Sequence, residues 1–556
     1  MGPFSLLLKA YILASAAGES MISASKCAYH LKKLRKGLAR ANDYAFLQMV
    51  WAADALQSGR DQAAAQYLTF PKEAADKSIL SSYSVHRWEL ESLLIQLFLT
   101  PKKEIRPGPN LLLNCGTFDT LALTTNRLRQ LEDVEAALYL PSQSIFVEMH
   151  RIGQRQFHWQ RGYFNIPQFY RYAYIYNQGK CAEYFEGKYG LSIDDLMFVG
   201  FSLFATSQRV AWLPRGYNSP DIGLSAELVA KALPLLSLPL TEVREKTAAA
   251  VAEVTEKHGK PLPTAFLPSV VRQYPLMSTD ENFDLLIAPI PELILLRVTG
   301  GLYYDLIGGG QALLNEANDR FEQYCAEYLS AVATRFAVTR SYQYGRKGLQ
   351  VATPDLLVKD GGKLVIAAEC KATKLTYLAQ FADDPFEAEK KQYDQLATGV
   401  FQVWRFFSHI RRGLVEEVLG DAAYAMVITL DPFLSMSHEL RDQVMERALS
   451  LAAEEPNILE EDRRPVIFCP IYDLEAIMRV GDEDSFLAAL AATQEKRFSG
   501  WQLREVHRDC NKAKEKTPPR DFPFALDDLL PWWKRTRELA AGIKQAAVPS
   551  ISVRGG

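Results

Sequence analysis

The stretch from Thr353 to Lys371 reads TPDLLVKDGGKLVIAAECK, and it constrains the fold more than any other part of the chain. Two apolar runs flank a pair of glycines, which is the pattern of an antiparallel β-hairpin. Strand side chains alternate between the two faces of a sheet, so Glu369 and Lys371 share one face and Cys370 lies on the other. A purely structural strand does not need a carboxylate and an ammonium at its end, and their presence indicates a functional site.

The segments around this hairpin alternate between helical and extended patterns. Before it, NEANDRFEQYCAEYLSAVATRF has apolar residues at helical spacing. After it, Asp384, Pro385 and Glu387 have the spacing of an N-terminal cap, and they predict one long helix that ends at Gly413. Two further apolar runs, YAMVITL and RPVIFCPI, are typical of strands beside helical sequence. This order predicts an α/β unit with a mixed sheet flanked by helices.

The rest of the chain has a different character. With 556 residues it is too long for one ordinary core. Residues 1 to about 135 have mostly helical spacing, and we expect the aromatic-rich run from Ser144 to Tyr176 to be strand in part. We predict a mostly helical N-terminal domain of one or two subdomains at residues 1–304, the α/β domain at 305–515, and a C-terminal extension at 516–556.

Composition limits the environment of the protein. The seven cysteines form no CxxC pair, so neither a zinc site nor a disulfide framework is indicated, and a reducing cytoplasm is the simple expectation. No run approaches 18 uninterrupted apolar residues, so we expect no transmembrane span and no membrane partner. The net charge of −3 means that any basic surface for nucleic acid must be local.

The hairpin brings a second carboxylate, Asp355, near Glu369. If Asp360–Gly362 is a three-residue loop, Asp355 pairs with Ala367, and Glu369 is its diagonal neighbour on the same face at roughly 7–8 Å. Two carboxylates at this separation can reach one hard cation such as Mg²⁺, which also accepts waters and phosphate oxygens. A two-residue turn would shift the parity and place Asp355 on the wrong face, so the prediction includes the odd loop.

The hairpin resembles the PD-(D/E)XK nuclease superfamily, which has the restriction-endonuclease-like fold. The resemblance lies in Pro354-Asp355 on one strand and Glu369-Cys370-Lys371 at the end of the next, and it covers about residues 310–500. It extends to Glu322 in the preceding helix, where family members often have an acidic residue. It extends also to Gln395 in the following helix, where many members have glutamine.

The resemblance implies metal-dependent hydrolysis of phosphodiester bonds. Asp355, Glu369 and Glu322 would bind Mg²⁺, for which Mn²⁺ would substitute. Lys371 would orient or help to deprotonate the attacking water and stabilise the charge that develops on phosphorus. Gln395 would be a further site residue. DNA is the expected substrate because most members of the superfamily cut DNA, and RNA is the less favoured one.

Two alternatives to a catalytic site stay open on the sequence alone. Triplets of the same form occur at 186–188 and 389–391 without a hairpin, and the charges at the hairpin end could simply face water. The domain could also be a nucleic-acid-binding or scaffold protein that keeps the nuclease fold without cutting. The architecture, a large unfamiliar domain fused to such a nuclease, resembles bacterial restriction and anti-phage defence proteins. Cutting both DNA strands often needs two active sites, so a homo-oligomer is one expectation.

Two groups of residues elsewhere have the chemistry to contact nucleic acid. Basic residues that flank the hairpin could contact phosphates or could simply be solvated: Arg340, Arg346, Lys347 and Lys374. A second group mixes aromatic residues with arginines: Arg155, Trp159, Arg161, Tyr163, Phe164, Tyr170, Arg171 and Tyr172. It could stack on unpaired bases, and the alternative is a packed aromatic core with exposed arginines.

Overall fold

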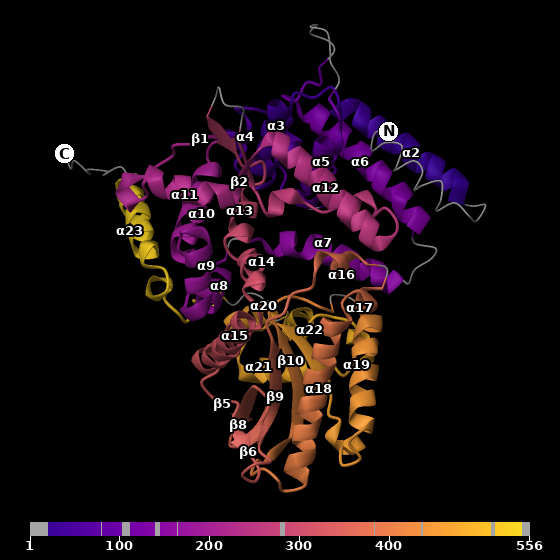
Figure 1. The fold of residues 1–556 in the computed structure, drawn as a ribbon, viewed down its shortest axis with the longest axis vertical. Helices are drawn as coiled ribbons and strands as arrows, with labels where there is room; N and C mark the ends of the chain where they lie inside the picture. The colour runs from indigo at the N-terminus through magenta and orange to yellow at the C-terminus, as the bar shows by residue number, and fades with distance from the viewer. Residues whose placement is uncertain are drawn as a thin grey trace, which may run out of the picture.

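A computed structural model of the chain describes residues 20–78, 80–102, 112–139, 145–163, 165–278, 284–382, 384–434, 437–512 and 518–546. The architecture is mixed α/β, which confirms the predicted class. A mainly helical N-terminal part lies at one end of the molecule and a five-stranded sheet with its covering helices lies at the other (Figure 1).

The N-terminal half consists mostly of helices, as predicted from residue 20 onward; residues 1–19 lie outside the described residues. The aromatic-rich run that was expected to be strand in part is instead the two helices α7 and α8. In α8 the residues Phe169, Tyr172 and Tyr176 are spaced by three and four and are buried, so helical periodicity decides the structure of this run. The helices are α2 (Ser20–Leu38), α3 (Asp43–Gln57), α4 (Asp61–Ala64), α5 (Arg87–Leu99), α6 (Phe118–Tyr139), α7 (Ile145–Arg161), α8 (Ile166–Tyr176), α9 (Gly179–Tyr189), α10 (Ile193–Ser207), α11 (Ala226–Leu236), α12 (Leu240–His258), α13 (Glu292–Arg297) and α14 (Leu302–Leu306).

A small sheet of short strands accompanies these helices. Its order is β1-β4-β3-β2, and each strand has three residues: β1 (Trp212–Pro214), β2 (Ser237–Pro239), β3 (Leu276–Ser278) and β4 (Leu285–Ile287). Prolines punctuate this region in the sequence, which explains why its strands stay short.

The larger sheet has the order β11-β10-β9-β8-β5. The strands β5, β8 and β9 pair antiparallel, whereas β9, β10 and β11 pair parallel, so the carboxyl ends of β9, β10 and β11 meet at one edge. The predicted hairpin and both later strands are present. The edge strand β5 and the short β6-β7 hairpin were not predicted. The bounds are β5 (Phe336–Arg340), β6 (Gln343–Tyr344), β7 (Val351–Ala352), β8 (Leu356–Asp360), β9 (Lys363–Lys371), β10 (Leu419–Thr429) and β11 (Val466–Pro470).

Helices cover both faces of this sheet, as expected (Figure 1). The helix α15 (Gln311–Val332) packs on the face that carries Leu356, Ile366 and Ala368. The helices α18 (Lys390–Arg411) and α19 (His438–Ala453) pack on the opposite face, which carries Leu357 and Ala367. The remaining helices are α16 (Tyr377–Phe381), α17 (Pro385–Ala388), α20 (Ile471–Val480), α21 (Glu483–Ala492), α22 (Leu503–Cys510) and α23 (Pro531–Ala546).

The single long helix expected from Asp384 to Gly413 is in fact two helices. The Asp384 side chain caps the four-residue helix α17 by accepting a hydrogen bond from the backbone N–H of Glu387, at 3.0 Å. The chain then leaves helical conformation at Glu389, where φ is −135° and ψ is 46°, and α18 starts at Lys390. The cap was read correctly, but no glycine or proline marks the break at Glu389.

The hairpin turn differs from the prediction in a way that matters for the site. Asp360 pairs with Lys363, so Gly361-Gly362 is a two-residue turn, and both glycines have positive φ (56° and 80°), as tight hairpin turns require. The predicted three-residue loop is therefore wrong. A β-bulge at Val365 supplies the odd residue instead, because Lys359 pairs with Leu364 whereas Val358 pairs with Ile366.

The bulge restores the parity that a two-residue turn alone would have reversed. Beyond it Leu357 pairs with Ala367 and Leu356 with Ala368. Continuing this register places Asp355 opposite Glu369, not diagonal to it as predicted. The two carboxylates thus meet on one face, as the sequence indicated, through a different turn and a closer pairing.

One apolar core runs through the N-terminal helices, the α15 face of the sheet and the C-terminal helix. In α23 the indole of Trp532 is 1% exposed and stacks on Phe198 of α10 at 5.3 Å between ring centroids. Figure 1 shows α23 beside α10 and α11, far from the sheet. The boundaries at 304 and 515 stay predictions, but apolar packing is continuous across both.

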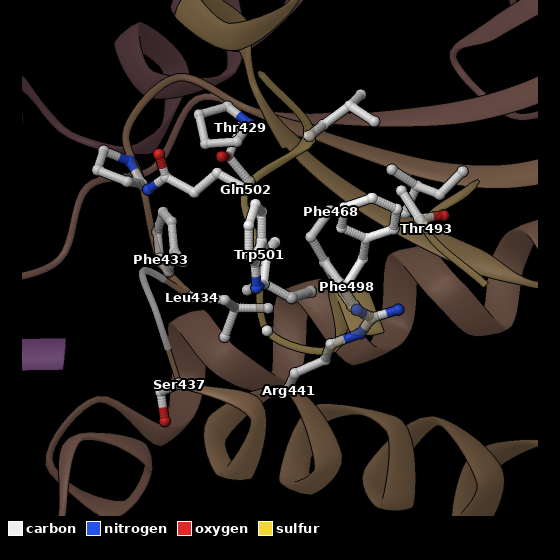
Figure 2. A pocket seen from close by; sticks show the side chains of 16 residues that line it. Thr429, Phe433, Leu434, Ser437, Arg441, Phe468, Thr493, Phe498, Trp501 and Gln502 are labelled. Carbon is white, nitrogen blue, oxygen red and sulfur yellow. The ribbon is translucent and has the colours of Figure 1, made fainter. Parts of the chain in front are cut away.

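Residues after α21 close the end of the sheet around a small cavity of about 60 Å³. Figure 2 shows Trp501 among Phe433, Phe468 and Phe498 in this cavity. The space is enough for only a few water molecules. No helix in the described part of the chain is both long enough and apolar enough to cross a membrane.

Candidate active site

Asp355 and Glu369 come together at the end of the hairpin that is remote from the turn. Asp355 immediately precedes β8, and its Oδ2 accepts a hydrogen bond of 2.7 Å from the backbone N–H of Cys370. Glu369 is 3% exposed and lies on the next strand. The backbone of one strand therefore fixes the carboxylate of the other.

The environment of Glu369 raises the pKa of its carboxyl group. Burial is the main reason that its pKa rises to about 7. The Lys371 ammonium opposes this rise, whereas the Asp355 carboxylate, which is hydrogen-bonded to Glu369, adds to it. Two carboxyl groups held this close share negative charge that an added cation would neutralise.

Lys371 contacts Glu369 directly. Its Nζ donates to Glu369 Oε2 at 2.7 Å, and its side chain is 20% exposed. Burial disfavours the charged form, but the Glu369 and Asp355 carboxylates outweigh it and raise the pKa of Lys371. Lys371 is therefore an ammonium at neutral pH in this state, partly open to solvent at the edge of the sheet.

Glu322 reaches this group from α15. Its side chain is 22% exposed, and Oε2 lies 3.8 Å from an Nη2 atom of Arg340. Burial is the main reason that the pKa of Glu322 rises to about 7, and the Asp355 and Asp319 carboxylates add to the rise. Arg340, which also pairs with Asp319 at 2.5 Å, thus offsets the negative charge of acidic residues of α15.

Gln395 lies on the helix that packs against this group but makes no hydrogen bond with it in the described structure. It is half-buried on α18. Its position one helical turn before Gly399 places it on the face of α18 that meets Glu369 and Lys371. The predicted role of Gln395 stays a prediction.

Gly399 is a site residue that sequence reasoning missed. A Cβ atom at this position would lie 3.3 Å from Glu369 Cβ and 3.3 Å from Lys371 Cε. The absence of a side chain lets α18 pack directly against the two charged side chains. The available signal was an isolated glycine within an otherwise regular helical pattern, which often has a packing reason.

The carboxylates of Asp355, Glu369 and Glu322 are not arranged as a metal-binding cage in this structure. Within the described ranges, no group of three or more His, Cys, Asp or Glu side chains is arranged to hold a metal ion. The ligand atoms are instead occupied by protein donors, since Lys371 holds Glu369 and the Cys370 N–H holds Asp355. Their chemistry nevertheless suits Mg²⁺, because three carboxylates crowd one ammonium and two of them have a raised pKa.

The remaining basic residues of the region fall in two places. Arg346 and Lys347 are exposed in the β6-β7 hairpin. Lys374 was expected on the surface but is 6% exposed, and its Nζ lies 3.0 Å from Asp431 Oδ2. The aromatic and arginine-rich group of α7 and α8 is largely buried too: Arg155, Arg171 and Tyr172 are each at most 8% exposed.

We expect Gly399→Ala to lower activity without lowering stability. Alanine is favoured over glycine inside a helix by roughly 0.5–1 kcal/mol, but its methyl group would press on Glu369 and Lys371. If Glu369 and Lys371 act in phosphodiester cleavage, as the resemblance implies, a displacement of a few tenths of an ångström should slow cleavage by about tenfold. Gly187→Ala in α9 is the matched control, because nothing lies within 4 Å of its added Cβ. Equal cleavage rates for both variants would show that Gly399 does not shape the site.

Glu322→Gln should stabilise the metal-free protein at alkaline pH. A carboxyl group whose pKa is raised on folding, here from 4.5 to about 7, destabilises the folded state as pH rises through this window. Removing the charge should therefore raise the melting temperature at pH 8, by a free energy of at most about 3 kcal/mol, and the gain should vanish towards pH 5. Thermal unfolding in EDTA measures this, with the exposed Glu446→Gln of α19 as control. A gain in melting temperature that grows as the pH falls would contradict the raised pKa of Glu322.

Comparison with known proteins gives no independent assignment, because the chain matches no protein-family model, no curated protein and no solved structure.

Proposed function

We propose that the protein is a magnesium-dependent nuclease that hydrolyses phosphodiester bonds of DNA. The observation that carries the proposal is the convergence of Asp355, Glu369 and Glu322 with Lys371 at one end of the β8-β9 hairpin. These are the residues that the PD-(D/E)XK resemblance selects. Within this proposal, the five-stranded mixed sheet between α15 and α18 is a restriction-endonuclease-like core.

The charge balance of the site supports a divalent cation. Asp355 and Glu369 would hold Mg²⁺, with Glu322 contributing directly or through water, and Mn²⁺ would substitute. When bound, the cation polarises a phosphoryl oxygen and makes coordinated water more acidic. Because Glu322 and Glu369 have a pKa of about 7, both must lose protons as the cation binds.

The protein groups have separable tasks. The Cys370 N–H keeps the Asp355 carboxylate oriented before any ligand arrives, so that little reorganisation is needed. Lys371 is protonated in this state, which favours donation of hydrogen bonds to water or phosphate oxygens over acceptance of a proton. Its ammonium would thus stabilise negative charge as the phosphodiester is attacked.

The choice of DNA over RNA, and a role in bacterial restriction or anti-phage defence, rest on the resemblance alone. The test of the function is digestion of supercoiled plasmid DNA and of structured RNA, side by side, with Mg²⁺, Mn²⁺ or EDTA. Metal-dependent nicking of DNA supports the proposal. Cleavage of RNA alone would assign a ribonuclease, and binding without cleavage of either would assign a scaffold that keeps the fold.

A further inference from the structure

A second and larger cavity lies between the N-terminal helices and the carboxyl edge of the sheet. Its volume is about 570 Å³, within the usual range of small-molecule sites. Residues of α7, α8, α13 and α14 line one side of it. Lys374, Asp431 and Tyr472, which follow β9, β10 and β11, line the other. In α/β proteins the carboxyl edge of parallel strands is the common place for ligands.

Four cationic side chains that line this cavity are paired with carboxylates. Arg171 pairs with Glu475, Arg272 with Glu91 at 2.6 Å, Arg297 with Asp305 at 2.6 Å, and Lys374 with Asp431 at 3.0 Å. Each guanidinium or ammonium is therefore held in place before a ligand binds. The four pairs contribute four positive and four negative charges, which cancel one another.

Arg161 is the exception. Among the described residues no carboxylate lies within ion-pair distance of its guanidinium. It stacks 3.9 Å from the centre of the Tyr472 ring instead, and its Nη2 donates to His158 Nδ1 at 3.2 Å. Burial, together with Arg161 itself, lowers the pKa of His158 to about 3, so the imidazole is neutral and adds no charge. The other charge near Arg161 is the buried Asp473 carboxylate, whose pKa the guanidinium lowers against the effect of burial. Among the described residues Arg161 is thus the one cation lining the cavity that has no carboxylate in ion-pair contact.

The rest of the wall combines aromatic rings with polar groups. Tyr163, Tyr304 and Tyr377 line the cavity with Tyr472. Gln168 and Gln273 also line it; the Gln168 amide bonds to Asn165 and Thr299, and the Gln273 amide donates to the Tyr274 hydroxyl at 3.5 Å, so each would exchange a protein partner for a ligand. The Tyr472 hydroxyl is buried without a hydrogen-bond partner in the described structure, and so is Nε of Arg171. Both residues line the cavity, so these two atoms are candidate contacts for a ligand in it.

We propose that this cavity binds a nucleotide, with the phosphate on Arg161 and the base among the tyrosines. Guanidinium groups bind phosphate strongly, tyrosine rings stack on bases, and amide side chains read base edges. The nucleotide has two sources, a free mononucleotide or one residue of a nucleic-acid strand drawn into the cavity. The inference does not depend on the proposed nuclease activity, because the cavity is lined by none of the four charged site residues.

Calorimetric titration in EDTA tests this proposal without any cleavage. The probes are the four nucleoside 5′-monophosphates, adenosine and inorganic phosphate. We expect at least one monophosphate to bind wild type, and to bind at least about tenfold more weakly to Arg161→Gln. Adenosine and phosphate alone should bind more weakly than AMP. Arg412→Gln, on an exposed arginine after α18, should bind like wild type.

Circular dichroism establishes that Arg161→Gln is folded. Tyr472→Phe is the second variant, since it removes a hydroxyl that has no partner and should weaken nucleotide binding several-fold without lowering the melting temperature. Displacement of AMP by a short oligothymidylate would identify a strand residue as the source, and no displacement would identify a free nucleotide. Failure of all four monophosphates to bind, equal binding by folded variants, or equal binding of phosphate alone would overturn the proposal.

Discussion

Cleavage of plasmid DNA by Lys371→Met should be slower than that by wild type by about 10²–10⁴-fold, with little change in DNA affinity. Methionine keeps the long unbranched stem that packs beside Gly399 but removes the ammonium. If Lys371 acts on the attacking water and the developing charge, its contribution appears mainly in the transition state. A lysine that merely contacted one phosphate would instead weaken binding and reduce the salt dependence by about one unit.

The measurement is a nicking time course with filter binding at several salt concentrations. Lys363→Met is the matched control, because Lys363 lies on the same strand, is exposed, and is next to the turn. Manganese binding to Lys371→Met should also be measured, since loss of the ammonium leaves Glu369 with a still higher tendency to be protonated. Unchanged cutting by Lys371→Met would contradict the catalytic role and favour the alternative, in which the charges at the hairpin end are ordinary solvated surface residues.

Asp355→Asn should abolish cleavage by a different route. Asparagine can keep the hydrogen bond from the Cys370 N–H through its Oδ1 atom, so the backbone should stay in place while one negative charge is lost. Loss of a metal ligand removes several kcal/mol of charge stabilisation, which corresponds to a rate loss of about a hundredfold or more.

Excess Mn²⁺ should partly restore the activity of Asp355→Asn but not that of Lys371→Met, because only the first is limited by metal occupancy. A titration of cleavage rate against Mn²⁺ concentration measures the difference. The control is Asp360→Asn at the opposite end of the hairpin, where the carboxylate pairs with Arg335 at 3.0 Å near the surface. Full activity of Asp355→Asn in Mg²⁺ would remove Asp355 from the site.

The sequence predicted the elements of the sheet region well because their signals are local. The hairpin, the amphipathic helix before it and the two later strands each follow from periodicity within about twenty residues. The approach of Glu322 to Asp355 was predicted only through the resemblance, since the two residues lie on different elements. Alternation along one strand was enough to place Glu369 and Lys371 together.

The features that were missed depend on contacts between distant segments. The bulge at Val365 has no sequence signal, and β9 is irregular there next to β10, where the register also shifts between Leu419 and Tyr424. Lys374 is buried beside Tyr172, whose hydroxyl accepts a hydrogen bond of 3.1 Å from the Lys374 Nζ atom. Tyr172 lies on α8, so the sequence around residue 374 gives no sign of this burial. The cavity that holds Arg161 is assembled from both halves of the chain, so no local pattern could reveal it.

The bulge divides the hairpin into a part that tolerates changes in length and a part that does not. Deleting Val365 would leave Val358 opposite Ile366, and every pair from there to the carboxylates would keep its partner. Removing a residue between Ile366 and Glu369 would instead turn one carboxylate to the other face. The spacing between Asp355 and Glu369 is therefore not a fixed number, and an alignment of relatives should place its gaps on the turn side of Val365.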